Sequence, residues 1–192
     1  MTSLWLVRHG ATTAEPGVAI GSSDPPLSDE GLEQARRLAD DLARRKIAAV
    51  FASDLRRAVQ TTERIAAAQG PQVRADDRLR ELDFGAWEGR DFGDLWTEEP
   101  EAAAAWEHDL RATPPSFGET VTQLEAPINA FLKDASADRR GEVVVVAHRG
   151  SLAVLQALVS GQVLEDAFGA GLRLGEKRAV SLDLGDRIEH AR

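Results

Sequence analysis

Three short apolar runs stand out along the chain, and each is followed directly by polar residues. The first begins at Leu4, the second spans Ile47 to Ala52 and the third spans Glu142 to Ala147. Continuous apolar runs of this length are typical of strands buried on both faces of a parallel sheet. We therefore predict three buried strands, of which the first stops at Arg8 and His9.

Helical spacing of apolar residues fills much of the chain between these strands. Ser28 is a suitable N-cap for a helix from Asp29 to Arg45 with one apolar stripe. Ser53 and Asp54 are expected to cap a second helix that ends near Gly70. Caps, proline starts and glycine stops predict three further helical segments: Asp91 to Leu110 with a second piece from Pro100, a helix to about Ala135 that begins at a Thr120–Gln123 capping box and contains Pro127, and a helix capped by Ser151 and closed by Gly161.

The order strand, helix, strand, helix favours parallel strands joined by right-handed crossovers. We therefore expect an α/β fold, with a three-layer α/β/α arrangement around a mostly parallel central sheet. Two segments without periodicity, Thr12 to Pro26 and Arg78 to Gly89, are expected to be loops. In the tail, Ala179 to Leu184 and Arg187 to His190 are predicted as strands around a Gly185–Asp186 turn.

The length, composition and net charge of the chain limit the classes of protein to which it can belong. Its 192 residues, 43% of them hydrophobic, suit a single domain over 1–192, and no segment approaches the ~20 apolar residues of a membrane span. The absence of cysteine excludes disulfides and thiolate chemistry, and a net charge of −9 disfavours nucleic acid or an anionic membrane as a partner. Nothing near the first residue resembles a signal peptide, so we expect a cytoplasmic protein.

Two of the three buried strands end in similar polar groups. His9 follows Arg8 after the first strand, and His148 precedes Arg149 after the third. Because the carboxyl ends of parallel strands meet at one edge of a sheet, we expect these groups to converge, with Arg57 from the helix after the second strand. Such a positive cluster is costly unless it binds an anion, and guanidinium forks with imidazole donors suit a tetrahedral phosphoryl group. The sequence therefore predicts a phosphate pocket.

A metal site is the rival interpretation of the two histidines. The neighbouring Arg8 and Arg149 disfavour a cation between His9 and His148, and no metal-ligand spacing supports one. The P-loop pattern is absent, which argues against nucleotide hydrolysis by that route. Arg56 is expected to be a solvated surface residue.

Five segments extend the pattern over most of the chain. They read L-V-R-H-G-A-T from 6, P-L-S-D-E-G-L-E-Q-A from 26, S-D-L-R-R-A-V-Q-T-T from 53, L-R-E-L-D-F-G-A-W-E-G from 79 and V-V-A-H-R-G from 145. In this order they resemble the signature of the histidine phosphatase superfamily, also called the phosphoglycerate mutase-like family. The compact length and the D-F-G-A-W-E-G stretch are similar to its phosphatase branch, which includes the α-ribazole phosphatases.

What the resemblance implies is a metal-independent phosphomonoesterase that acts on a small organic phosphate without a cofactor, a histidine acid phosphatase-type phosphoric monoester hydrolase. His9 would be the nucleophile that forms a phosphohistidine, and Glu81 would be the proton donor. The resemblance also implies a helical lid at about 91–118. The residues that would complete the catalytic group are Arg8, Arg57 and His148, and those that would bind the substrate are Arg8, Thr12, Gly21, Arg57 and His148.

The chain departs from the family's pattern at several positions. Ala11 and Glu15 stand where many relatives carry other polar residues, and Arg149 stands where glycine is usual. The segment 117–120 reads F-G-E-T in place of a Gly-Gly-Glu-Ser region. These differences concern specificity more than chemistry. They leave open a phosphoglycerate mutase-type isomerase, or a phosphoprotein-directed regulator with weak turnover.

Two expectations concern the predicted lid. An acidic run at 98–101 would repel highly anionic substrates if it faced the pocket. The four tryptophans, Trp5, Trp87, Trp96 and Trp106, are expected to pack in the core or the lid and not to stack on a substrate, and His108 and His190 are expected at the surface.

Overall fold

A computed structural model describes residues 2–69, 73–135 and 141–182 of the chain. Within these residues a five-stranded sheet has the order β3-β2-β4-β1-β5. The first four of these strands run parallel, and β5 lies antiparallel to β1 at one edge. The strands are β1 (Thr2–Arg8), β2 (Ile47–Ala52), β3 (Val73–Ala75), β4 (Glu142–Ala147) and β5 (Lys177–Leu182).

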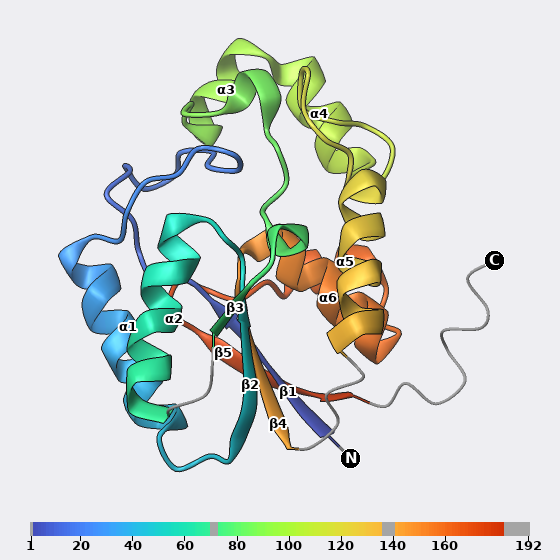
Figure 1. The fold of residues 1–192 in the computed structure, drawn as a ribbon. Helices are drawn as coiled ribbons and strands as arrows, with labels where there is room; N and C mark the ends of the chain where they lie inside the picture. The colour runs from blue at the N-terminus through green and yellow to red at the C-terminus, as the bar shows by residue number, and fades with distance from the viewer. Residues whose placement is uncertain (1, 70–72, 136–140, 183–192) are drawn as a thin grey trace.

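Helices cover both faces of the sheet, as expected for three layers (Figure 1). On one side lie α1 (Asp29–Leu42) and α2 (Arg56–Gln69), and on the other lie α5 (Val121–Ala135) and α6 (Arg149–Ser160). The central strand β4 contributes to both layers because successive side chains of a strand point to opposite faces. Val144 and Val146 pack with α1 and α2, whereas Val143 and Val145 pack with α5 and α6.

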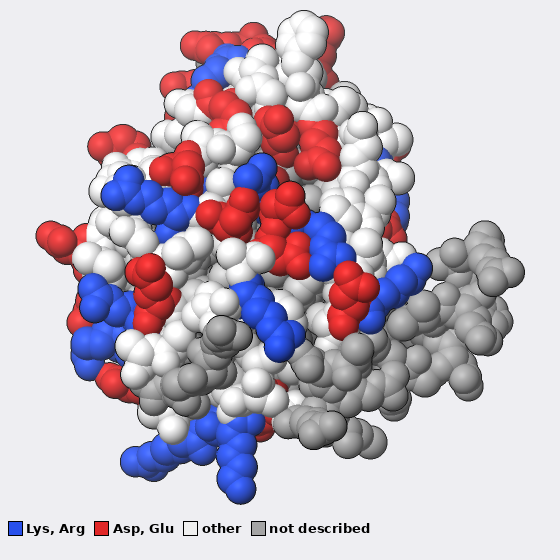
Figure 2. All heavy atoms as spheres, viewed as in Figure 1, with Lys and Arg blue, Asp and Glu red and all other residues white. Residues whose placement is uncertain are grey.

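A smaller group of helices lies beyond the carboxyl edge of the sheet (Figure 1). It contains α3 (Phe92–Glu98) and α4 (Pro100–His108), while α7 (Leu164–Gly169) follows α6. A separate apolar cluster of Ala19, Trp87, Leu95 and Ala103 holds α3 and α4 against the loop before them. Acidic side chains gather over this part of the surface (Figure 2). No helix in the described parts of the chain is long and apolar enough to cross a membrane.

Most predicted elements are present, with differences at their ends. The bounds of β2 and β4 match the prediction, α5 runs through Pro127, and Gly161 ends α6 in the left-handed conformation. The first helix ends at Leu42 and not at Arg45, and the last described strand is Lys177–Leu182. The strand β3 and the helix α7 were not predicted. The strand expected at 187–190 and its turn at 185–186 lie outside the described residues.

Two predicted caps are wrong. His148, not Ser151, is the N-cap of α6, and the Ser151 hydroxyl accepts a hydrogen bond from the His148 N–H at 3.1 Å. The second helix begins at Arg56, whose N–H donates to the Asp24 carboxylate at 2.6 Å. The start of the second helix thus depends on a tertiary contact with the loop that contains Asp24.

Phe117 is the one residue other than glycine with a positive φ among the described residues, at 58°. Its side chain is 97% exposed, so no packing offsets the steric cost of this conformation, which is roughly 1–2 kcal/mol for an L-residue. We expect Phe117→Gly to stabilise the fold by up to about 1 kcal/mol, or a rise of about 2–4 °C in Tm for a chain of this size. Thermal unfolding of both proteins measures the shift, and a lower Tm for the glycine variant would contradict it.

Candidate active site

The register of the two central strands brings the two motif histidines together. Arg8 pairs with Ala147 at the carboxyl ends of β1 and β4, so His9 and His148 are the next residue on each strand. The His9 N–H donates to the Ala147 carbonyl at 3.1 Å, and the two imidazole centroids lie 5.0 Å apart. The juxtaposition that the sequence predicted is therefore present.

Hydrogen bonding fixes the tautomer of His9. Its Nδ1 lies 2.7 Å from the Gly10 carbonyl oxygen, which can only accept, so Nδ1 carries the proton and Nε2 keeps its lone pair. Burial lowers the pKa of His9 to about 3, and the positive charges of Arg57 and Arg8 contribute to this shift. His9 is thus a neutral imidazole with a free nucleophilic nitrogen at physiological pH.

His148 has the opposite tautomer. Arg57 Nε donates to His148 Nδ1 at 3.1 Å, so the proton of the neutral ring is on Nε2. Burial, with Arg57 and His9 nearby, lowers the pKa of His148 well below its usual value. Its Nε2 is buried and has no hydrogen-bond partner among the described residues. A buried donor without a partner is costly, so this N–H is suited to a ligand.

Arg57 is almost completely buried, with 1% of its surface exposed. Besides His148 it donates to the carbonyl oxygens of Ser23 at 2.7 Å and Gly21 at 2.9 Å. Burial lowers its pKa, while the carboxylates of Glu81, Asp24 and Glu88 oppose that effect. The guanidinium remains charged, because an arginine does not lose its proton in proteins.

Arg8 supplies a second, half-buried guanidinium beside His9. Its Nη1 donates to the Leu172 carbonyl at 2.9 Å, and its Nε has no partner in the described parts of the chain. Burial lowers its pKa, an effect that Glu81 partly offsets. Arg8, which precedes His9, and His148, whose ring lies 5.0 Å from the His9 ring, therefore each have an N–H without a partner in the described ranges.

The Glu81 carboxylate lies at the N-terminus of α6. It accepts hydrogen bonds from the N–H groups of Gly150, at 3.0 Å, and Leu82, at 2.9 Å. A Cβ at Gly150 would lie 2.4 Å from Glu81 Oε1, so glycine is required there for this approach. Glu81 lines the same pocket as His9 and Arg8.

The pocket has a volume of about 820 Å³, much more than a phosphoryl group occupies. Its lining combines a basic, an apolar and an acidic set of side chains. The basic set is Arg8, His9, Arg57 and Arg149; the apolar set includes Val18, Ile20, Phe84, Phe92, Trp106, Leu110, Phe168 and Leu174; the acidic set is Glu81 and the exposed Glu15, Glu30, Glu107 and Glu165.

The structure places the other predicted site residues differently. Thr12 lines the pocket, whereas Gly21 does not, and the Gly21 N–H donates to Glu88 Oε1 at 2.8 Å. Substrate binding by these two residues stays a prediction. Arg56 is exposed, as expected. No cluster of His, Cys, Asp or Glu within the described ranges is suited to hold a metal ion.

The structure also shows whether the acidic run and the tryptophans of the predicted lid lie at the pocket. Glu98, Glu99 and Glu101 do not line the pocket. Trp87 is buried and packs against other residues, as expected. Trp106 also packs against other aromatic residues, as expected, since it stacks on Phe92 with ring centroids 6.1 Å apart, and it lines the pocket as well.

Sequence reasoning missed several residues that support the site. Thr61 Oγ1 accepts from the Gly10 N–H at 3.1 Å, and Gln34 Oε1 accepts from the Ala11 N–H at 2.8 Å. Glu88 accepts from several N–H groups of the loop around Gly21. Gln34, Thr61 and Glu88 all lie inside the motif segments, and this position indicates a role near the site. The sequence does not show which groups they bind.

The depressed pKa of His9 makes the fold sensitive to acid. An unfolded histidine binds a proton below pH about 6.5, whereas His9 in the folded state does so only near pH 3. Between these values the unfolded chain binds more protons, so the free energy of unfolding falls as the pH falls from 6.5 toward 3. We expect urea unfolding at pH 7.5 and 5 to show a smaller loss for His9→Gln than for the unchanged protein. An equal loss in both would contradict the assignment.

Comparison with known proteins agrees with this geometry. The family model of the histidine phosphatase superfamily (branch 1) matches residues 4–184. The putative phosphoserine phosphatase 2 of Hydrogenobacter thermophilus is 31% identical over 86% of this chain and 82% of its own length. The adenosylcobalamin/alpha-ribazole phosphatase of Escherichia coli is 32% identical over 84% of this chain and 81% of its own.

A solved structure gives the same result. The mycobacterial glucosyl-3-phosphoglycerate phosphatase in complex with VO3 superposes with a TM-score of 0.85 at 30% identity, over 94% of this chain and 93% of that one. Family model, relatives and fold agree with the motif histidines brought together at the sheet edge. The chain therefore belongs to branch 1 of the histidine phosphatase superfamily.

Proposed function

We propose that the protein is a metal-independent phosphoric monoester hydrolase that cleaves a small organic phosphate through a phosphohistidine on His9. The observation that carries this proposal is the arrangement around the His9 lone pair. Nε2 is unprotonated, the His148 ring lies 5.0 Å from the His9 ring, and Arg8 and His148 each have a buried N–H without a partner among the described residues. A nucleophile surrounded by fixed donors suits attack on phosphorus, where charge develops on the equatorial oxygens.

In the first step, His9 Nε2 attacks the phosphorus atom and forms an N–P bond. The bond between phosphorus and the ester oxygen breaks, and Glu81 gives that oxygen its proton. Arg8 and His148 donate to the phosphoryl oxygens, and Arg57 holds the His148 ring in the donor tautomer. The alcohol leaves, and the phosphoryl group stays on His9.

In the second step, water replaces the histidine. The ionised Glu81 takes a proton from the water as its oxygen attacks phosphorus, and the N–P bond breaks. The products are inorganic phosphate and the neutral His9 imidazole, and Glu81 is protonated again. His9 and Glu81 therefore act in both steps.

The rest of the pocket favours a particular kind of ester. Its aromatic wall, which includes Phe84, Phe92 and Trp106, suits a leaving group with an apolar surface. The exposed carboxylates of Glu15 and Glu107 on the lining disfavour a second phosphate on the substrate. This charge pattern supports a monophosphate hydrolase over a mutase that retains a bisphosphate.

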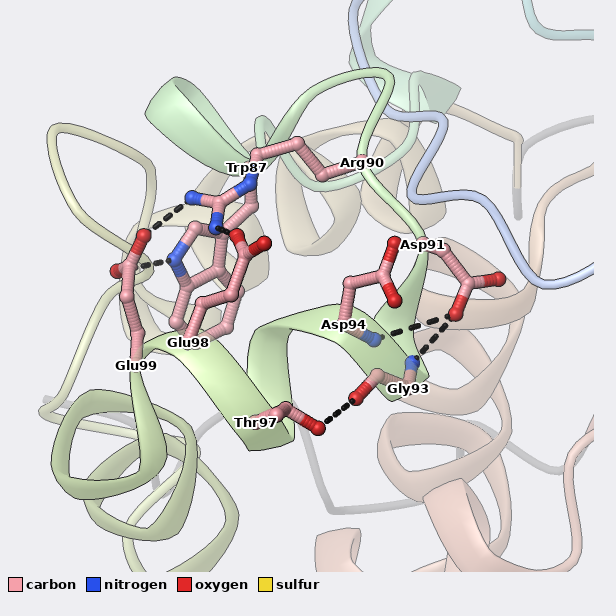
Figure 3. Close-up of polar contacts among 8 residues, drawn as sticks. All are labelled: Trp87, Arg90, Asp91, Gly93, Asp94, Thr97, Glu98 and Glu99. Atoms are coloured by element: carbon pink, nitrogen blue, oxygen red, sulfur yellow. Dashed lines mark hydrogen bonds and ion pairs between the residues drawn. The ribbon is translucent and has the colours of Figure 1, made fainter.

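The proposal includes a helical lid at about 91–118 within a single domain. Phe92, Trp106 and Leu110 of this segment line the pocket. Glu99, between α3 and α4, is bound to the segment that precedes α3. It accepts a hydrogen bond from Trp87 Nε1 at 3.1 Å and forms an ion pair with Arg90 (Figure 3). These contacts support a lid whose α3–α4 junction is attached to the loop at 87–90.

Phosphate release from a panel of monoesters in EDTA tests the function. We expect release from esters with apolar leaving groups, and EDTA should not change its rate. A second arm supplies 3-phosphoglycerate with 2,3-bisphosphoglycerate. Rapid interconversion without net phosphate release would contradict the hydrolase and favour the isomerase, and loss of activity in EDTA would contradict the metal-independent mechanism. The expected cytoplasmic location and the absence of nucleic-acid and membrane partners stay predictions.

A further inference from the structure

The Glu88 carboxylate accepts five hydrogen bonds close to the site, although Glu88 does not line the pocket. Its Oε1 accepts from the N–H groups of Gly21 and Ser22, both at 2.8 Å, and from Phe84 at 3.2 Å. Its Oε2 accepts from the Ser23 hydroxyl at 2.8 Å and the Ser23 N–H at 3.3 Å. One side chain thus satisfies the donors of three consecutive residues in an otherwise irregular loop.

The same loop holds Arg57 from its carbonyl side. The Ser23 and Gly21 carbonyls accept from the two Nη atoms of Arg57, and Arg57 Nε donates to His148. The N–H groups of residues 21–23 therefore face Glu88, while carbonyls of the same residues face the guanidinium. Glu88 and Arg57 have opposite charges on the two sides of one peptide segment, and the carboxylate also favours the charged guanidinium.

The segment has little room to relax. A Cβ at Gly21 would lie 1.9 Å from the Leu82 carbonyl oxygen and 2.5 Å from Glu88 Oε1. The loop, the Glu88 carboxylate and the backbone at Leu82, the residue after Glu81, are in close contact at this point. A change in Glu88 must therefore move the loop, and the loop carries the acceptors that orient Arg57.

We propose that Glu88 is a positioning residue for the phosphoryl site, which acts through the 21–23 loop to hold Arg57 against His148. The inference rests on the proposed function, because Arg57 and His148 act on the phosphoryl group. Glu88 itself does not touch the substrate. Its loss lowers the precision with which the His148 Nε2–H is aimed.

A double-mutant cycle between Glu88→Gln and Arg57→Ala tests the inference. Glutamine has nearly the shape of glutamate, but its amide NH₂ group would face N–H donors of the 21–23 loop, to which it cannot hydrogen-bond. We expect Glu88→Gln alone to lower kcat/KM about 10- to 100-fold, the range typical of residues that orient a functional group. In the Arg57→Ala background the same change should cost less than about twofold, because the group it orients is gone. A merely structural role would give the full cost in both backgrounds.

Glu142→Gln is the matched control. Glu142 is also half-buried and accepts a hydrogen bond, from Trp5 Nε1 at 3.1 Å, but it lies at the opposite end of β4. We expect it to lower Tm without changing kcat/KM. Ser23→Ala serves if Glu88→Gln does not fold, since it removes only the hydroxyl bond; it should cost about threefold, again only when Arg57 is present.

The design distinguishes a failure of the proposed function from a failure of the positioning role. If the unchanged protein releases no phosphate from any ester, the proposed function fails, and the cycle is then measured on the binding of inorganic phosphate by calorimetry. If the protein is active but the costs of Glu88→Gln and Arg57→Ala multiply, the positioning role is overturned and the proposed function stands. An effect of less than twofold for a folded Glu88→Gln would also overturn it.

Discussion

Replacing His9 with alanine is expected to lower phosphate release by about 10⁴-fold or more, because the covalent route loses its nucleophile. In the proposed site the donors of Arg8 and His148 remain in this variant, so we expect the affinity for inorganic phosphate to change much less than the rate. Steady-state release from a monoester gives the first quantity and calorimetry gives the second. Circular dichroism checks that the variant is folded.

His108→Ala is the matched control for this experiment. His108 is an exposed histidine at the end of α4 and does not line the pocket. Its loss should leave both rate and affinity unchanged. Full activity in folded His9→Ala would rule out the covalent mechanism.

Glu81→Gln is expected to have the second largest effect, about 10²- to 10⁴-fold on esters whose alkoxide needs a proton. The glutamine has no proton to give at this step. An ester such as para-nitrophenyl phosphate, whose leaving group is stable without one, should react in the first step almost normally. Because hydrolysis of the phosphoenzyme still needs Glu81 as a base, stopped-flow absorbance should show a burst of nitrophenolate followed by slow turnover.

The burst separates Glu81 from a residue that only stabilises the fold. A uniform slowing of both ester classes, without a burst, would contradict the assignment of Glu81 as acid and base. Glu142→Gln removes a carboxylate at the far end of β4 and should show the kinetics of the unchanged protein with both ester classes.

The sequence was sufficient to predict the three central strands, the helical layers and the convergence of His9, His148, Arg8 and Arg57. These features depend on local apolar runs and on the rule that carboxyl ends of parallel strands share an edge. The short strand β3 has an exposed pattern, and α7 has only six residues, so neither has a periodic signal strong enough to detect.

The contacts that orient the site could not be predicted in the same way. The tautomers of His9 and His148 follow from hydrogen bonds to Gly10 and Arg57, whose geometry exists only in the folded chain. Four of the five hydrogen bonds to Glu88 join segments 65 to 67 residues apart, and the motif that contains Glu88 does not show them. Sequence motifs located the reacting groups, and tertiary packing determined how each one is held.

The most direct test of the mechanism is to look for the phosphoryl group on His9. Folded Glu81→Gln is mixed with para-nitrophenyl phosphate, quenched in alkali because phosphohistidine is labile in acid, and digested for mass spectrometry. We predict a phosphorylated peptide in which the modified residue is His9, formed at the rate of the burst. A burst without any phosphoryl group on His9, or one carried by another residue, would contradict the account.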